Sequence, residues 1–121
     1  MPLRDQASLF DALTEIARVE REVWGDQTDA AIMRCIAATR VRTGRAAQVS
    51  GIAATLGLSP STVHARLNRL AARGRPEADV PAGVIARVDG GYREAAAGRR
   101  LNQQAADRIG EVLARYLRRS D

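Results

Sequence analysis

One interruption limits how this chain can fold. The segment IAATLGLSPSTVHARLNRL, from Ile52 to Leu70, has helical apolar spacing on both sides of a glycine and a proline. Gly57 follows the last turn of the first helical stretch, where glycine takes a left-handed conformation without a Cβ clash. Ser59 is suited to accept a backbone N–H as N-cap, and Pro60 to fill the first helical position, where no N–H is needed. One helix therefore ends and another begins within a few residues.

The helices on either side of this break are predicted over residues 50–56, with Ser50 as N-cap, and over residues 60–73. Val63, Leu67 and Leu70 share one side of the second helix and anchor it against the first. A short helix, a glycine turn and a second helix with a polar outer face form a helix-turn-helix, whose second helix fits a DNA major groove about 12 Å wide. An ordinary antiparallel helix pair is the alternative. The opposite side of the second helix carries Ser61, Thr62, Ala65, Asn68 and Arg69.

Apolar spacing predicts three further helices, over residues 6–24, 29–43 and 98–119, the last of them beginning between residues 96 and 102. Thr28 or Asp29 is expected to cap the second of these. The composition, rich in alanine, leucine and arginine with few aromatic residues, favours a mainly α protein. At 121 residues, the chain is predicted to form a single domain, 1–121, with a modest core.

A change of pattern after Gly74 predicts a β-hairpin, over residues 84–95. VIARV and YREA have the composition of two short strands, and the sequence Asp89-Gly90-Gly91 between them is typical of a tight turn. A second register, with its tip at Pro81-Ala82-Gly83, remains open. A hairpin directly after the second helix of a helix-turn-helix is the arrangement of a wing.

Charge is distributed unevenly along the chain. Residues 30–76 contain eight arginines and no acidic residue, whereas residues 1–29 contain seven acidic residues and three arginines. A concentrated positive field of this kind suggests a polyanionic partner such as nucleic acid. The alternative is a solvated basic face in a chain whose 19 basic residues are all arginine.

Several classes of function find little support. Cys35 is the only cysteine and His64 the only histidine, so one chain cannot assemble a disulfide or a Cys/His zinc site. A buried structural role for Cys35 is favoured over a redox role. His64 is expected to be exposed and to have no functional role. With no phosphate-binding glycine loop and no nucleophile paired with a base, we expect no enzyme, metal or cofactor. No apolar run reaches a membrane span and no signal sequence is visible, so a cytoplasmic protein is expected.

The residues I52-A53-x-x-L56-G57-L58-S59-x-x-T62-V63-x-x-R66-L67 resemble the helix-turn-helix of bacterial transcription regulators. The segment YREAAAGRRL resembles the strand-to-helix junction of the MarR family, with Glu94-Ala95 and Ala97-Gly98-Arg99 at the motif positions. This resemblance implies a winged helix-turn-helix with flanking dimerisation helices. It also implies a wing-tip arginine, whereas the tip predicted here carries Asp89 and the arginines lie behind it.

We predict that Arg69 and Asn68 contact base edges, since arginine reads guanine and asparagine reads adenine through paired hydrogen bonds. Contact with phosphate alone is the alternative for both. The other members of the predicted DNA-binding set would contact the sugar-phosphate backbone of DNA and so position the helix or the wing on the duplex. The full set is Ser59, Ser61, Thr62, Ala65, Arg66, Asn68, Arg69, Arg73, Arg75, Arg87 and Arg93.

The first and last helices carry apolar stripes that a small winged domain is not expected to hide. Glu20 interrupts the first stripe, where a buried carboxylate needs an arginine partner or incomplete burial. The resemblance implies that both helices pair with those of a second copy, which places two recognition helices about 34 Å apart, one DNA turn. Packing within the chain is the alternative. The predicted dimerisation residues are Leu9, Leu13, Ile16, Ile109, Val112, Leu113, Tyr116 and Leu117.

The function favoured by the sequence is therefore a sequence-specific regulator of transcription that binds double-stranded DNA as a homodimer, most like a MarR repressor. By analogy with that family, a small-molecule effector between the dimer helices and the DNA lobes is a possible further partner. The competing hypothesis is a winged-helix module that binds a protein through its basic face and does not bind DNA.

Overall fold

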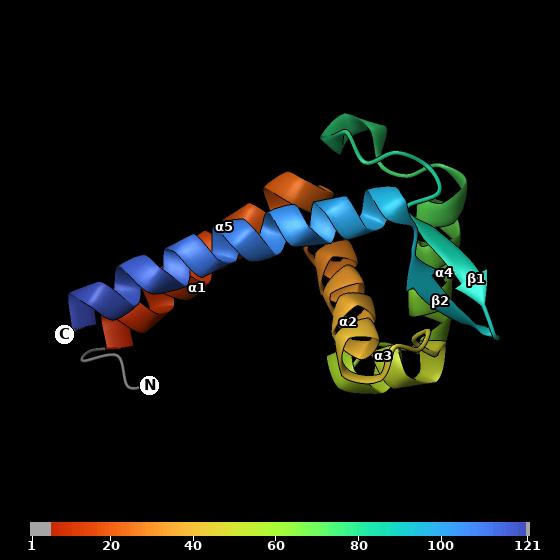
Figure 1. The fold of residues 1–121 in the computed structure, drawn as a ribbon, viewed down its shortest axis with the longest axis horizontal. Helices are drawn as coiled ribbons and strands as arrows, with labels where there is room; N and C mark the ends of the chain where they lie inside the picture. Colours follow the sequence, from red (N-terminus) through yellow and green to blue (C-terminus); the bar gives the residue numbers. More distant parts are fainter. Residues whose placement is uncertain (1–5, 121) are drawn as a thin grey trace.

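The computed structural model describes residues 6–120 (Figure 1). Most of this part of the chain is helical, and the strands form one small hairpin. The elements in chain order are α1 (Gln6–Trp24), α2 (Gln27–Thr43), α3 (Val49–Leu56), α4 (Pro60–Ala72), the short 3-10 helix η1 (Pro76–Ala78), β1 (Ile85–Val88), β2 (Gly91–Glu94) and α5 (Ala96–Ser120).

The molecule has a long arm and a compact head (Figure 1). In the arm, α1 and α5 lie side by side and run in opposite directions. From the arm, α2 leads down to α3, and α4 with the hairpin completes the head. The core sits where α2, α3, α4 and the hairpin meet. Its most deeply buried apolar side chains are Trp24, Ile32, Met33, Ile36, Val63, Leu67, Leu70, Val80, Val84 and Tyr92.

Two predicted helix starts are wrong. Helix α2 begins at Gln27 rather than residue 29, and its N-cap is Asp26, which accepts a hydrogen bond from the Asp29 N–H at 2.9 Å. Aspartate at this position suits the exposed N–H groups of a first turn. Helix α3 begins at Val49, with Gln48 as N-cap and no side-chain cap, so Ser50 is already helical. Helix α5 begins at Ala96, the earliest of the starts between residues 96 and 102 that the sequence left open.

The break between α3 and α4 follows the predicted local chemistry. Gly57 has φ +68°, and Leu58 N–H donates to the Ala53 carbonyl at 3.0 Å, which closes the turn. Ser59 Oγ accepts from the Thr62 N–H at 3.1 Å, so Ser59 caps α4 with Pro60 in the first turn. The end of α4 differs slightly from the prediction, since Arg73 is the C-cap rather than a helical residue.

The hairpin takes the first of the two predicted registers. Strands β1 and β2 are antiparallel, with Val88 opposite Gly91, so the tip is the pair Asp89-Gly90 and the register centred on residues 81–83 is wrong. Both tip residues have positive φ, +52° and +76°, as a two-residue hairpin turn requires. Ala47 pairs with Tyr92 on the other side of β2 and ties the hairpin to the segment before α3.

The predicted fold class is confirmed: the protein is mainly α, with a two-stranded wing behind a helix-turn-helix and long helices on either side. In the part of the chain that the structure describes, no helix combines the length and apolar character that a membrane span requires.

Candidate nucleic-acid interface

Helix α4 presents a polar face to solvent. Val63, Leu67 and Leu70 are fully buried, so the helix is fixed in rotation about its axis. Four small or polar residues predicted for DNA contact, Ser61, Thr62, Ala65 and Asn68, are exposed on the other side. Ser59 is exposed too, but its hydroxyl is occupied as the N-cap of the helix. The surface is therefore shallow and polar, as close approach to base edges requires.

Three predicted DNA-binding arginines converge on one buried carboxylate. Asp29 has no exposed side-chain surface. Its Oδ1 accepts from Arg66 Nη1 at 3.1 Å, and its Oδ2 accepts from Arg69 Nη2 at 2.9 Å and from Arg75 Nη2 at 2.8 Å. Asp26 adds a second carboxylate, which lies 2.7 Å from Arg66 Nη1. We call Asp26, Asp29 and these three arginines the Asp29 cluster. It joins the corner between α1 and α2 to the recognition helix and to the loop after it.

The electrostatics of this cluster follow from its geometry. The hydrogen bond with Asp29 raises the pKa of Arg75 further above its ordinary value, so this guanidinium stays charged. Burial opposes ionisation of Asp26, but the Asp29 N–H and the charge of Arg66 outweigh it and hold the pKa of Asp26 below its usual value. Arg66 and Arg75 are mostly covered, with 28% and 16% of their side-chain surface exposed, whereas Arg69 is 42% exposed. Arg69 is thus the cluster arginine best placed to contact a ligand.

The positive block of the sequence is partly neutralised in space. Besides the cluster arginines, Arg34 binds the buried Glu20 at 2.9 Å, and Arg40 binds the buried Glu94. The other three arginines of residues 30–76 are Arg42, Arg45 and Arg73, and they form no ion pair among the described residues. The positive field at α4 is therefore weaker than the count of arginines in the sequence predicts.

The wing is held against α4 and carries its arginines behind the tip. The Tyr92 hydroxyl donates to Asn68 Oδ1 at 3.4 Å, and the Arg87 guanidinium lies 5.7 Å from the centre of the Tyr92 ring. Arg93 is half-buried and donates from Nη2 to the Gly44 carbonyl at 2.7 Å. Arg87 is thus the exposed arginine of the wing, and Arg93 mainly ties the wing to the end of α2.

The predicted dimerisation residues divide into buried, half-buried and exposed groups. Val112 and Tyr116 are buried within their own chain because α1 packs along α5, so these two do not lie on an outer face as predicted. Ile16 and Ile109 are half-buried. Glu20 forms its ion pair with Arg34 of α2 in the same chain. Apolar side chains that remain exposed on the arm are Leu9, Phe10, Leu13, Leu113 and Leu117.

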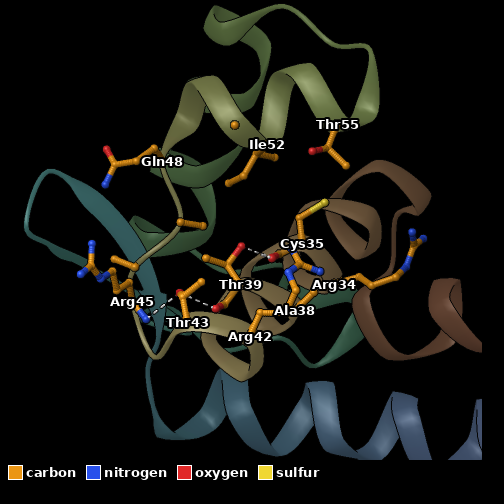
Figure 2. Close-up of a pocket in the computed structure, with 13 residues that line it drawn as sticks. Arg34, Cys35, Ala38, Thr39, Arg42, Thr43, Arg45, Gln48, Ile52 and Thr55 are labelled. Atoms are coloured by element: carbon orange, nitrogen blue, oxygen red, sulfur yellow. Dashed lines mark hydrogen bonds between the residues drawn. The ribbon is translucent and has the colours of Figure 1, made fainter.

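Cys35 lies in a groove between α2 and α3 (Figure 2). The thiol is partly buried, and burial raises its pKa despite the nearby charges of Arg34 and Arg42, so it is not an activated nucleophile. His64 is exposed on α4. Among the described residues, no group of His, Cys, Asp or Glu is placed to hold a metal ion.

Asp29 and Asp26 were not predicted as partners of the arginines, because the sequence pattern identifies them only as cap and loop residues. Periodicity places Arg66 and Arg69 on one flank of α4 but does not identify the residue opposite that flank. Arg42 and Arg45 were not singled out either. No local signal distinguishes them, because none of the arginines from Arg34 to Arg69 has an acidic residue three or four positions away.

Comparison with known families gives a match to a DNA-binding family. Residues 26–75, less than half of the chain, match a family model described as winged helix-turn-helix DNA-binding. The matched range runs from the cap of α2, through α3 and α4, to the last arginine of the Asp29 cluster. Comparisons with curated proteins and with solved structures gave no match. The match and the geometry together support a DNA-binding domain of the winged helix-turn-helix type.

Proposed function

We propose that this protein is a sequence-specific, double-stranded DNA-binding regulator of transcription, a cytoplasmic homodimeric repressor similar to the MarR family, and not an enzyme. The observation that carries the proposal is the exposed polar face of α4, capped at Ser59 and fixed by three buried apolar residues. It lies within the residues that match the winged helix-turn-helix DNA-binding family.

Arg69 is the proposed base reader. Its Nη2 is held by Asp29, and the remaining guanidinium donors are left for a base edge, so the side chain is oriented before DNA arrives. Replacing Arg69 with alanine should weaken binding to the preferred duplex by about 1–3 kcal/mol and relax the preference at one base position. Fluorescence anisotropy measures this with duplexes selected from a random pool and their single-base variants.

The matched control is His64→Ala, which removes another exposed side chain of α4. Circular dichroism of both variants establishes that they are folded. Equal affinity of the Arg69→Ala variant and the unaltered protein for every duplex would contradict the assignment of Arg69. Absence of salt-dependent binding to any duplex by the unaltered protein would contradict the proposed function itself.

The homodimer is supported by the apolar side chains exposed along the arm. Leu13 is 51% exposed, Phe10 60% and Leu113 39%, although these residues belong to helices whose other faces are packed. A second copy placed on this surface would bury a leucine-rich patch twice, once from each protomer. Winged regulators that read paired half-sites need two recognition helices, and dimerisation through the arm leaves α4 exposed on each head.

Replacing Leu13 with glutamate should weaken the dimer by about two orders of magnitude or more, because each fully buried leucine contributes about 1.5–3 kcal/mol and the dimer contains two copies. Sedimentation equilibrium measures the dissociation constant. Val41→Glu is the control, since Val41 is an exposed apolar residue of the head, 73% accessible, rather than of the arm. An unaltered protein that remains monomeric at high concentration would contradict the dimer.

An effector site is proposed where the arm meets the head. A groove of about 330 Å³ lies between α1, α2 and α5, with mainly apolar walls that include Trp24, Ile109 and Leu113. Glu20 and Arg34 lie at its polar side, so a small apolar molecule with one charged group would fit its chemistry. Trp24 is the only tryptophan, which makes its emission a direct reporter of binding in a screen of aromatic acids and amines. An effector should change both this emission and DNA affinity.

A protein-interaction module without DNA binding is the second candidate. It is favoured by the Asp29 cluster, in which two carboxylates reduce the positive charge beside α4. The anisotropy measurement with selected duplexes separates the two functions, because a module that does not bind DNA gives no salt-dependent signal.

A further inference from the structure

The end of α2 and the start of α3 enclose a groove of about 440 Å³ (Figure 2). In this view Ile52 and Thr55 form the α3 side, facing Cys35 and Thr39 of α2, and Arg45 and Gln48 lie at one end. We propose that this groove is a second DNA-contacting surface, at which Arg42 and Arg45 bind phosphodiester oxygens of the duplex that α4 reads. The inference rests on the proposed function and assigns part of the affinity to residues outside α4.

Charge is the first argument. Arg42 and Arg45 are exposed and have no carboxylate within 4.0 Å among the described residues, whereas five of the eight arginines in residues 30–76 are paired with acids. The unneutralised part of the basic block thus lies at the end of α2 as well as at Arg73. Asp89 of the wing tip is the acidic residue that lines the adjoining cleft, which it shares with Arg45 and Arg93. Two unpaired guanidinium groups give the groove a net positive field.

The backbone adds to this field. The N-cap of α3, Gln48, makes no side-chain cap, so the first N–H groups of this helix are not satisfied by that side chain. In the first turn, a Cβ added at Gly51 would meet no neighbouring atom within 4 Å, so this side of the turn is open. A phosphate held by Arg45 would therefore approach N–H groups that point out of the helix, where the helix dipole favours an anion.

Position is the third argument. The end of α2 and the adjoining α3 lie at the end of the head remote from the arm (Figure 1). The groove between them runs back along α2 to Arg34, and Arg45 and Gln48 also line the adjoining cleft beside Asp89 of the wing tip. A duplex held by α4 continues past the recognition helix in both directions, and its backbone needs positive partners beyond the major-groove contacts. Arg66 and Arg75 are occupied by Asp29, so they are poorly placed to supply this charge.

The test measures how affinity depends on salt. The double variant Arg42→Ala, Arg45→Ala and the unaltered protein are each titrated with a labelled, mixed-sequence duplex between about 50 and 200 mM salt. In a plot of the logarithm of the binding constant against the logarithm of the salt concentration, each phosphate contact contributes close to one unit to the slope. We expect the slope of the double variant to fall by about two per protomer, with weaker binding to all sequences equally.

The control variant is Arg21→Ala, Arg118→Ala, which removes the same charge from exposed positions on the arm. We expect its slope to equal that of the unaltered protein. The double variant Arg42→Lys, Arg45→Lys should restore the slope, because lysine also binds phosphate as a point charge. A slope for Arg42→Ala, Arg45→Ala equal to the control, or a lysine variant as weak as the alanine variant, overturns this inference alone. No duplex binding by the unaltered protein overturns the proposed function with it.

Discussion

Replacing Asp29 with alanine should lower the free energy of unfolding by about 3 kcal/mol, near the lower end of the cost of breaking a buried ion pair. Asp29 is fully buried, and its loss leaves Arg66, Arg69 and Arg75 without their shared acceptor. These arginines retain between 16% and 42% exposure, so water partly replaces the lost partner and limits the cost. Asp29 also lies in the first turn of α2, where a negative charge stabilises the helix.

Urea denaturation measures this loss, and the matched control is Glu77→Ala. Glu77 also binds Arg75, but it is 67% exposed, and an exposed ion pair contributes at most about 1 kcal/mol. We expect the Glu77 variant to unfold near the midpoint of the unaltered protein. If both variants lost the same small amount, the cluster around Asp29 would be only a surface feature, and the recognition helix would be held by its apolar face alone.

Replacing Gly74 with alanine should have an effect of similar size. Gly74 follows the C-cap of α4 and has φ +62°. This left-handed conformation costs a residue that has a Cβ roughly 1–2 kcal/mol. The added Cβ would also lie 2.5 Å from the Pro81 carbonyl oxygen and closer still to that of Val80. Both obstacles are backbone atoms, in a loop closed by the paired backbones of Arg75 and Val80. Displacing these backbone atoms should cost about another 1–3 kcal/mol, so the free energy of unfolding should fall by about 3 kcal/mol in total.

Gly44→Ala separates the two causes. Gly44 has φ +70°, but a Cβ added there would have no neighbouring atom within 4 Å, so alanine meets only the backbone cost. Thermal and urea unfolding of the two variants should differ by the cost of displacement, with Gly74→Ala the less stable. Equal losses would mean that the loop after α4 moves freely and that its contact with Gly74 does not hold it.

Local chemistry made the helix-turn-helix and the wing predictable. Gly57, Ser59 and Pro60 specify a left-handed turn, a cap and a helical start within a few residues, and no distant contact is needed to choose among alternatives. Asp89-Gly90 was predictable for the same reason, since few residue pairs accept positive φ twice. The start of α2 was harder because Asp26, Thr28 and Asp29 are all good caps, and the geometry selects Asp26.

The candidate site was less predictable because its key contacts join distant parts of the chain. Asp29 is separated by 37 residues from Arg66 and by 46 from Arg75. A helical pattern identifies the buried side of α4 but does not show what lies beside its flank. For the same reason the apolar stripe of α5 was interpreted as one surface, whereas packing on α1 buries Val112 and Tyr116 and leaves Leu113 and Leu117 accessible.

The antiparallel arrangement of α1 and α5 has a practical consequence. Because α1 starts and α5 finishes at the same extremity of the arm, far from the head, a tether joined to either would project away from α4 (Figure 1). Immobilising the protein by that extremity on a sensor chip would leave the wing and recognition helix accessible to flowing duplex. The same attachment would restrict access to the exposed leucines of the arm. DNA binding and self-association should therefore be measured with the protein attached in opposite orientations.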